Sequence, residues 1–173
     1  MGAASGRNFA FIDGQNLHVG VTHLGWKLDW RRFRVYLQEH YRVARAFYFL
    51  GYIPDNQAVY TRLQNASYTL VFKTFTYRGD GKPKGNVDAE LVLQAMIEYP
   101  QYERAVIVTG AGDFGCLVRY LYQQDKLERV ISPNRKQCSA LLKRAARERL
   151  DFLEAARGKI EYKNEGAPPQ DVT

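Results

Sequence analysis

The 173-residue chain contains only two cysteines and three histidines. Cys116 and Cys138 lie far apart and form no Cys-x-x-Cys pair, which argues against both a zinc site and a disulfide framework. His18, His23 and His40 show no spacing typical of a zinc triad or of an acid–base pair, so we expect surface or loop roles for them. His18 lies nearest to the acidic residues described below and is the exception to test.

Long apolar segments are also absent. No apolar run approaches the roughly 20 residues that a membrane span requires. The N-terminal MGAASGR lacks the apolar core of a signal peptide, and Gly6 stands where a myristoylation signal has Ser or Thr. We therefore expect a cytoplasmic protein with no membrane partner and with reduced cysteines.

Positive charge is abundant. The chain has 25 Lys and Arg against 18 Asp and Glu, which gives a net charge of +7, and 46% of its residues are hydrophobic. Segment 134–149 alone contains six basic residues and one acidic residue. Such a segment suits a polyanion such as nucleic acid, although a solvated helix face explains it equally well.

Predicted strands and helices alternate along the chain. Continuous apolar or β-branched runs predict strands over 9–12, 43–52, 68–77, 104–109 and 127–132. Helical spacing predicts a helix capped by Asp29 and others over 54–64, 87–99, from 113 onward and over 137–150, with loops at 13–14 and 78–86. This alternation predicts one α/β domain over 8–162, with a mostly parallel sheet of about five strands covered on both faces. We expect the polar tail 163–173 to be disordered.

Three acids can meet at one edge of this sheet. Asp13 and Asp113 each follow a predicted strand, and Asp88 begins a helix on its apolar side, where an unpaired charge is costly. For Asp88 and Asp113 the alternative is a carboxylate favoured by a helix N-terminus. Because parallel strands end at the same edge, the three acids together predict a site for Mg²⁺ or Mn²⁺. Such an ion can orient a water and stabilise charge while a phosphodiester is attacked.

A second set of polar residues has a simpler interpretation. Glu90, Gln94 and Glu98 follow one another at intervals of four in the helix predicted over 87–99. Residues with this spacing share one face of a helix. We expect this stripe to face solvent, outside the metal site.

Three sequence blocks resemble a known family. FIDGQNL at 11–17, KGNVDAELVLQAM at 84–96 and VIVTGAGDFGCLV at 106–118 are similar to the signature blocks of NYN domains, the LabA-like branch of the PIN-like nuclease superfamily. The blocks fall in the family's order, the resemblance runs from about residue 9 to 153, and SPNRKQCSALLKRAA resembles the family's last strand and helix. The resemblance implies a PIN-like three-layer α/β/α sandwich with metal-dependent ribonuclease activity.

The resemblance also assigns roles to individual residues. Asp13 matches the acid after the first strand, Asn16 the polar residue that supports it, and Asp88 the acid at the start of the helix. Asp113 matches the second acid of the family's S-G-D-x-D-F block. Thr109 stands where that block usually has serine and keeps the hydroxyl group. Asp13, Asp88, Asp113 and Asn16, together with position 111, form the expected catalytic set, and Thr109 supports it.

Two positions depart from the family pattern. Gln94 stands where many relatives have an aspartate, on the helix face already placed outside the metal site. Ala111 replaces the first acid of the S-G-D-x-D-F block, which in PIN-like nucleases helps to hold the metal. Ala111 fits either the natural decay of a nuclease into a binder or a deliberate Asp→Ala change. The three remaining acids are intact, which favours the deliberate change as a hypothesis.

Basic residues cluster near the predicted acidic site. Several occupy the glycine-rich loop before Asp88, and others lie on elements expected to flank the same sheet edge: Arg78, Lys82, Lys84, Arg119, Arg135, Lys136 and Lys143. These could neutralise RNA phosphates. Tyr77 could stack on an unpaired base, although packing in the protein is the commoner role of a strand tyrosine. The choice of RNA over DNA follows from the resemblance alone.

Three function classes follow from the sequence. The first is a metal-dependent endoribonuclease that Ala111 weakens or inactivates. The second is a non-catalytic RNA-binding module on the same fold. The third is a protein-interaction domain, which would bind no RNA at any salt concentration. A homo-oligomer is compatible with each of them.

Overall fold

The computed structural model describes residues 6–73, 76–81, 83–84 and 87–163, without the side chains of residues 76, 83 and 84. Lys82 and nearly all of the tail predicted to be disordered lie outside these residues, so the structure does not test them.

Six parallel strands form the central sheet. They are β1 (Asn8–Asp13), β2 (Val43–Gly51), β3 (Tyr68–Lys73), β6 (Ala105–Val108), β7 (Leu127–Ser132) and β8 (Leu150–Phe152). Their order is β3-β2-β1-β6-β7-β8, with every neighbouring pair parallel. β1 and β6 are therefore adjacent in the middle of the sheet, and the residues that follow them lie at the same edge.

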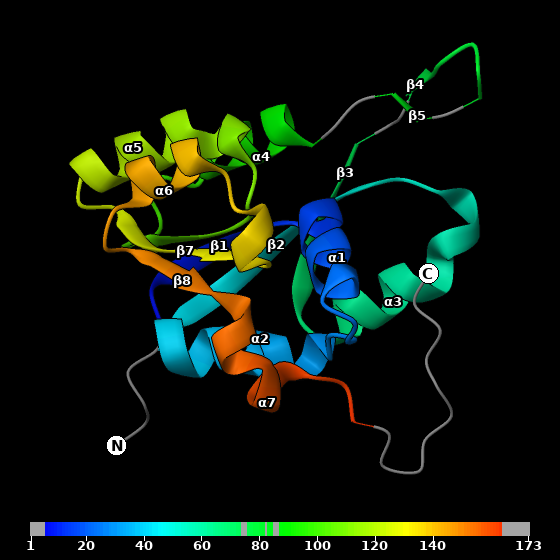
Figure 1. The fold of residues 1–173 in the computed structure, drawn as a ribbon, viewed down its shortest axis with the longest axis horizontal. Coiled ribbons are helices and arrows are strands. Elements are labelled where there is room, and N and C mark those ends of the chain that lie inside the picture. Colours follow the sequence, from blue (N-terminus) through cyan, green and yellow to red (C-terminus); the bar gives the residue numbers. More distant parts are fainter. Residues whose placement is uncertain (1–5, 74–75, 82, 85–86, 164–173) are drawn as a thin grey trace.

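Helices cover both faces of the sheet. One layer comprises α4 (Asp88–Ile97), α5 (Gly115–Gln123) and α6 (Ala140–Ala146), and the opposite layer comprises α1 (Gly14–His23), α2 (Trp30–Tyr41), α3 (Gln57–Asn65) and α7 (Arg157–Ile160). Figure 1 shows the first layer on one side of the sheet and α2 and α7 on the other. The short hairpin of β4 (Thr76–Tyr77) and β5 (Pro83–Lys84) extends away from this body. The predicted three-layer α/β/α sandwich is confirmed.

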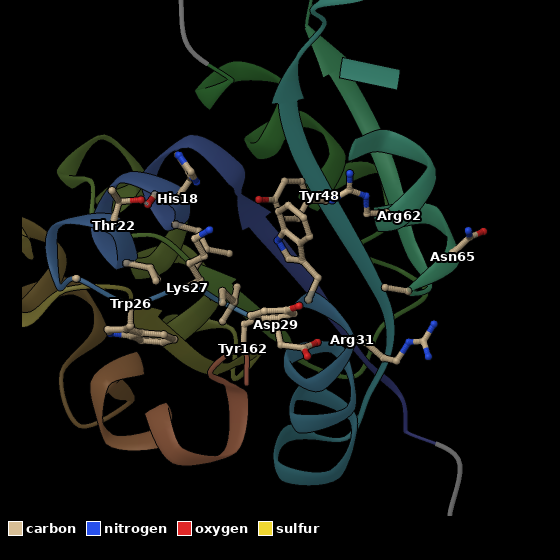
Figure 2. A pocket seen from close by; sticks show the side chains of 16 residues that line it. His18, Thr22, Trp26, Lys27, Asp29, Arg31, Tyr48, Arg62, Asn65 and Tyr162 are labelled. Carbon is tan, nitrogen blue, oxygen red and sulfur yellow. Dashed lines mark hydrogen bonds between the residues drawn. The ribbon is translucent and has the colours of Figure 1, made fainter. Parts of the chain in front are cut away.

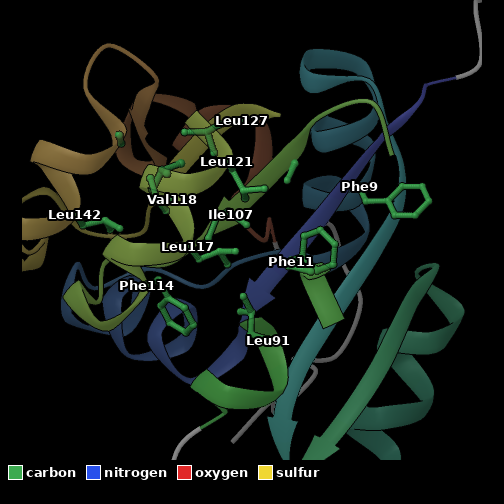
Figure 3. Packing of buried hydrophobic residues seen from close by; sticks show 14 of the residues in the cluster. Phe9, Phe11, Leu91, Ile107, Phe114, Leu117, Val118, Leu121, Leu127 and Leu142 are labelled. Atoms are coloured by element: carbon green, nitrogen blue, oxygen red, sulfur yellow. The ribbon is translucent and has the colours of Figure 1, made fainter. Parts of the chain in front are cut away.

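The two faces of β1 build two separate cores. Every residue of β1 is buried, as expected for a strand covered on both sides. Phe9 and Phe11 point into the α4–α5–α6 layer, where Phe11 packs with Leu91 and Phe114 (Figure 3). Ala10 and Ile12 point into the other layer. Because side chains alternate along a strand, Asp13 follows Phe9 and Phe11 onto the α4 side.

The C-terminal part of the fold differs from the prediction. The helix predicted over 137–150 is shorter, because α6 begins after Ser139, whose hydroxyl accepts a hydrogen bond from the Leu141 amide, and ends at Arg147, which has a positive φ of 55°. The chain then adds the sixth strand, β8, at the edge of the sheet. Three residues are too few for a recognisable strand pattern, and the pairing with β7 supplies the stability that local sequence does not.

Two boundaries near the predicted site also differ. Residues 13–14, predicted as a loop, lead directly into α1, because the Asp13 carboxylate caps this helix by accepting a hydrogen bond from the Asn16 amide at 3.3 Å. The strand predicted over 68–77 ends at Lys73. Tyr77 lies instead in the hairpin with 68% of its surface exposed, so it does not pack in the core.

The polar stripe of α4 does not face solvent. Glu98 is only 8% exposed, accepts a hydrogen bond from Gln94 at 3.0 Å and lies 3.8 Å from Arg45 of β2. The solvent-facing side of the helix instead carries Leu93 and Ile97, which are 61% and 55% exposed. The prediction was wrong for Glu98, whereas Glu90 and Gln94 are partly exposed. Arg45 of β2 and Lys73 of β3 lie within ion-pair distance of Glu98 and Glu90.

Within the described residues, every helix is too short or too polar to cross a membrane.

Candidate acidic active site

Asp13 occupies the end of the central strand and is almost fully buried, with 6% of its surface exposed. Its two carboxylate oxygens accept hydrogen bonds from the Asn16 amide at 3.3 Å and from the Thr109 hydroxyl at 3.1 Å. Burial raises the pKa of Asp13, and these two hydrogen bonds oppose the increase by stabilising the charged form. The carboxylate is therefore held in one orientation at the edge of the sheet.

Asn16 and Thr109 form hydrogen bonds between the start of α1, which follows β1, and the loop that follows β6. The side-chain oxygen of Asn16 accepts a hydrogen bond from the Gly110 amide at 2.8 Å. The Thr109 hydroxyl accepts one from the Ala111 amide at 3.1 Å while it donates to Asp13. These bonds fasten the loop after β6 to the start of α1. The structure thus gives Asn16 and Thr109 the geometry of supporting residues.

Asp88 and Asp113 meet across the same edge. Asp88 is the first residue of α4, and Asp113 lies in the short helix Gly112–Phe114 that precedes α5. Asp113 lies close enough to Asp88 to raise the pKa of the Asp88 carboxyl group. Burial first, and then Asp113 and the charge of Asp13, raise the pKa of Asp88 to about 6. The predicted acids are therefore near enough to influence one another.

Lys73 is a further residue of this edge that the sequence did not reveal. Its ammonium group lies 3.6 Å from Glu90 of α4 and lowers the pKa of Asp88. The predicted strand over 68–77 placed Lys73 in mid-strand, whereas β3 ends there. A strand predicted to end at Lys73 would have placed this residue at the same edge of the sheet as Asp13, because both residues end parallel strands.

Ala111 lies at the position where the family has an acid. It is the N-cap of the helix Gly112–Phe114, with φ −81° and ψ 134°, and its side chain makes no capping hydrogen bond. The methyl group packs partly buried against the core beneath α5. Alanine is a poor N-cap, whereas aspartate is among the best. An aspartate therefore suits the backbone of this position as well as the chemistry of the site.

The donor chemistry suits a hard divalent cation only in part. Carboxylate oxygens from Asp88 and Asp113 are adjacent, and the charge of Asp13 acts on Asp88. Mg²⁺ is commonly held by one or two carboxylates together with waters. However, the described residues include no group of three or more His, Cys, Asp or Glu side chains close enough to hold a metal. The site thus offers a carboxylate pair with a nearby third acid rather than a complete cage.

The residues predicted to contact RNA divide into three groups. Arg78, Arg119, Lys136 and Lys143 are exposed. Arg135 is also exposed, but its guanidinium lies 4.0 Å from the ring centre of Phe152 on the edge strand β8. Lys82 and the side chain of Lys84 lie outside the described part of the chain. The basic surface is thus present, with Arg135 already engaged at the far edge of the sheet.

Two known proteins resemble this chain, one in sequence and one in fold. The chain is 27% identical over 114 residues to the low amplitude and bright protein LabA of Synechococcus elongatus, a match that covers 60% of this chain and 61% of that protein. The crystal structure of VPA0982 from Vibrio parahaemolyticus, a protein of unknown function, superposes with a TM-score of 0.72 at 20% identity over 94% of this chain and 100% of that one. The second likeness concerns the fold alone.

The family model of the NYN domain matches residues 9–153, a span from the first central strand to the residue after the edge strand β8. This span contains Asp13, Asp88 and Asp113 together with the Thr109 and Asn16 network. The protein belongs to the NYN domain family, a nuclease fold.

Proposed function

We propose that the protein is a metal-dependent endoribonuclease that hydrolyses RNA phosphodiester bonds, and that Ala111 weakens or abolishes its activity. The observation that carries this proposal is the convergence of Asp88 and Asp113 beside the buried carboxylate of Asp13, where burial and then the two neighbouring acids raise the pKa of Asp88. Acids forced together at the cost of a raised pKa are typical of functional sites. We place the activity in the cytoplasm, where Cys116 and Cys138 stay as the free thiols seen in the structure.

In this proposal the acidic residues hold the metal ion and the basic residues bind the RNA. A bound Mg²⁺ or Mn²⁺ supplies Lewis acidity and lowers the pKa of a coordinated water. Asp88 and Asp113 provide adjacent carboxylates for such an ion, and Asp13 provides a third whose orientation the Thr109 and Asn16 hydrogen bonds fix. Exposed basic residues such as Arg119 and Lys143 hold the RNA backbone by its phosphates.

Ala111 also supports a second candidate, a non-catalytic RNA-binding module. Loss of one ligand leaves the fold and the basic surface intact, so binding can persist without cleavage. This candidate predicts metal-independent RNA binding and no cleavage even when residue 111 is an aspartate.

An Ala111→Asp variant tests the proposal directly. Ala111→Asn is the matched control, because both side chains can cap the helix Gly112–Phe114 and only aspartate adds a charged ligand. Each protein is incubated with fluorescent single-stranded RNA and Mn²⁺, and cleavage is followed on denaturing gels. We expect Ala111→Asp to cleave at least about a hundredfold faster than either the unmodified chain or Ala111→Asn, as for loss of one strongly stabilising group.

Two results would contradict the proposal. Equal cleavage by Ala111→Asp and Ala111→Asn would remove the role of a carboxylate at residue 111. Metal-independent binding with no cleavage by any of the three proteins, on unstructured and hairpin RNA, would support the binding module instead.

A further inference from the structure

A large pocket lies on the other face of the sheet from the three acids. It has a volume of about 990 Å³ and is lined by α1, β2, α3, the segment leading into α2, and Tyr162. In Figure 2, His18 and Thr22 of α1 lie on one side of it and Arg62 and Asn65 of α3 on the other, with Tyr48 of β2 between them. This volume is at the upper end of the range of ligand-binding pockets.

The pocket combines flat aromatic surfaces with positive charge. Both tryptophans of the chain, Trp26 and Trp30, line it. Trp30 is also tied to the core through its backbone, because its carbonyl oxygen accepts a hydrogen bond from the Tyr68 hydroxyl at 2.8 Å. Aromatic rings of this kind stack on unpaired nucleobases.

Three cationic side chains complete the lining: Lys27, Arg31 and Arg62. One acid, Asp29, also lines the pocket, but its carboxylate accepts a hydrogen bond from the Arg32 amide at 3.0 Å and lies 3.5 Å from the Arg32 guanidinium. The pocket thus has a net positive charge and suits an anion.

Arg62 supplies the most specific indication. Its Nη1 atom is buried, and no hydrogen-bond acceptor contacts it within the described part of the chain. Guanidinium groups bind phosphate and other oxygen acceptors strongly, and a buried donor without an acceptor is costly. Arg62 also lines the pocket, so a phosphate there would pair with its guanidinium group.

The pocket begins next to the acidic site. Tyr48 pairs in register with Ile12, the residue before Asp13. Its ring also packs under Gly14, where an added Cβ would lie 2.5 Å from the Tyr48 ring. His18 lies one turn further along the same helix and faces the pocket. A chain bound at Asp13 can therefore continue around the start of α1 into the pocket.

We propose that this pocket binds one unpaired nucleotide of an RNA strand, with its base against Trp30 and its phosphate at Arg62, since Trp26 is only 6% exposed and belongs to the core. The inference rests on the proposed function, since it makes the pocket a subsite for RNA that also reaches the acids. It also gives a role to His18, the histidine nearest to the acidic residues in the sequence, because His18 lines this pocket.

Tryptophan fluorescence tests this subsite, because both reporters of the chain lie in it. A short single-stranded RNA is titrated into the unmodified protein in EDTA, so that neither metal nor cleavage is needed. We expect saturable quenching, and Arg62→Gln should weaken the apparent affinity at least about tenfold through loss of a charged hydrogen bond. Arg7→Gln, an exposed arginine that precedes β1 at the opposite edge of the sheet, should leave the affinity unchanged.

The outcomes separate this proposal from the proposed function. In the Ala111→Asp background, Arg62→Gln should raise KM for RNA cleavage and leave kcat unchanged. If Ala111→Asp cleaves but Arg62→Gln changes neither quenching nor KM, with circular dichroism showing a folded variant, the pocket proposal is overturned and the nuclease stands. If Arg62→Gln abolishes quenching although no variant cleaves, the pocket stands and the nuclease fails. Binding of free uridine monophosphate as tightly as the RNA would overturn an RNA strand as the occupant.

Discussion

Asp88 shows how the acidic site affects stability at the scale of one residue. Its pKa rises from 3.8 to about 6, mainly through burial and then through Asp113 and Asp13. The folded protein therefore holds this proton more tightly than the unfolded chain does. The metal-free protein should lose stability as pH rises through the interval from 3.8 to about 6, and the loss should be complete above it.

An Asp88→Asn variant should remove this loss. In EDTA near neutral pH we expect its free energy of unfolding to exceed that of the unmodified protein by about 1 kcal/mol, a value reduced for solvent screening of a half-buried group. The melting temperature should rise by about 2–4 °C. Below the ordinary aspartate pKa of 3.8 the two proteins should melt together. Scanning calorimetry across this pH range measures the difference.

Glu39→Gln, an exposed change on α2, is the control and should show no such pH-dependent gain. A variant Asp88→Asn that melts below the unmodified protein at neutral pH would show that the carboxylate is stabilising where it lies. That result would argue against a site in which burial disfavours the charged form of Asp88.

At the scale of secondary-structure elements, the junction between β1 and α1 positions Asp13 and Asn16. Gly14 follows Asp13 and lets the helix start against the sheet, because a Cβ there would lie 2.5 Å from the Tyr48 ring and 2.7 Å from the Phe49 carbonyl oxygen. The backbone oxygen cannot move aside as a flexible side chain would. The close approach orients both Asp13 and Asn16.

A Gly14→Ala variant should therefore destabilise the protein by about 1–3 kcal/mol, as overpacking does in other cores. Urea unfolding followed by circular dichroism should show a lower midpoint. Gly158→Ala in α7 is the matched control, since no described atom lies within 4 Å of its added Cβ, and it should be neutral or slightly stabilising. Equal midpoints for Gly14→Ala and the unmodified chain would mean that the junction relaxes without cost.

The elements that the sequence predicted are those with strong local patterns. The run FAFI at 9–12 in β1 and the run AVIV of β6 are apolar throughout, so their place in a parallel sheet followed. β8 was missed because three residues carry no periodic signal. The face of α4 that contacts the sheet could not be predicted either, because the pairing of Glu98 with Arg45 depends on tertiary contacts.

The functional residues also separate into those with a local sequence pattern and those that only the tertiary structure brings together. Asp13, Asp88 and Asp113 were predictable because strand ends and a helix start converge in any parallel sheet. The pocket around Arg62 was not, since its walls come from segments far apart in the sequence and its residues have no shared motif. Only the three-dimensional arrangement brings both tryptophans and Arg62 together.

Under the proposed function, charge at the scale of the whole molecule sets the strength of RNA binding. With a net charge of +7, the protein should bind single-stranded RNA with an affinity that falls linearly with salt on a logarithmic scale. Each phosphate contact contributes about 0.7 to the slope for single strands. Arg119→Gln should therefore flatten the slope by about 0.7, and Arg7→Gln at the opposite edge should not. Fluorescence anisotropy in EDTA over a salt series measures both. Identical slopes for the two variants would place the RNA elsewhere on the surface.

The central claim is that Ala111 occupies the position of a missing metal ligand in an otherwise intact acidic site. Calorimetric titration of Mn²⁺ into the unmodified protein, Ala111→Asp and Ala111→Asn tests it without any need for activity. We predict that Ala111→Asp binds Mn²⁺ at least about ten- to hundredfold more tightly than the other two, since even supporting residues change metal affinity that much. Adding Asp113→Asn to Ala111→Asp should remove the gain. Equal Mn²⁺ affinities for Ala111→Asp and Ala111→Asn would contradict the claim.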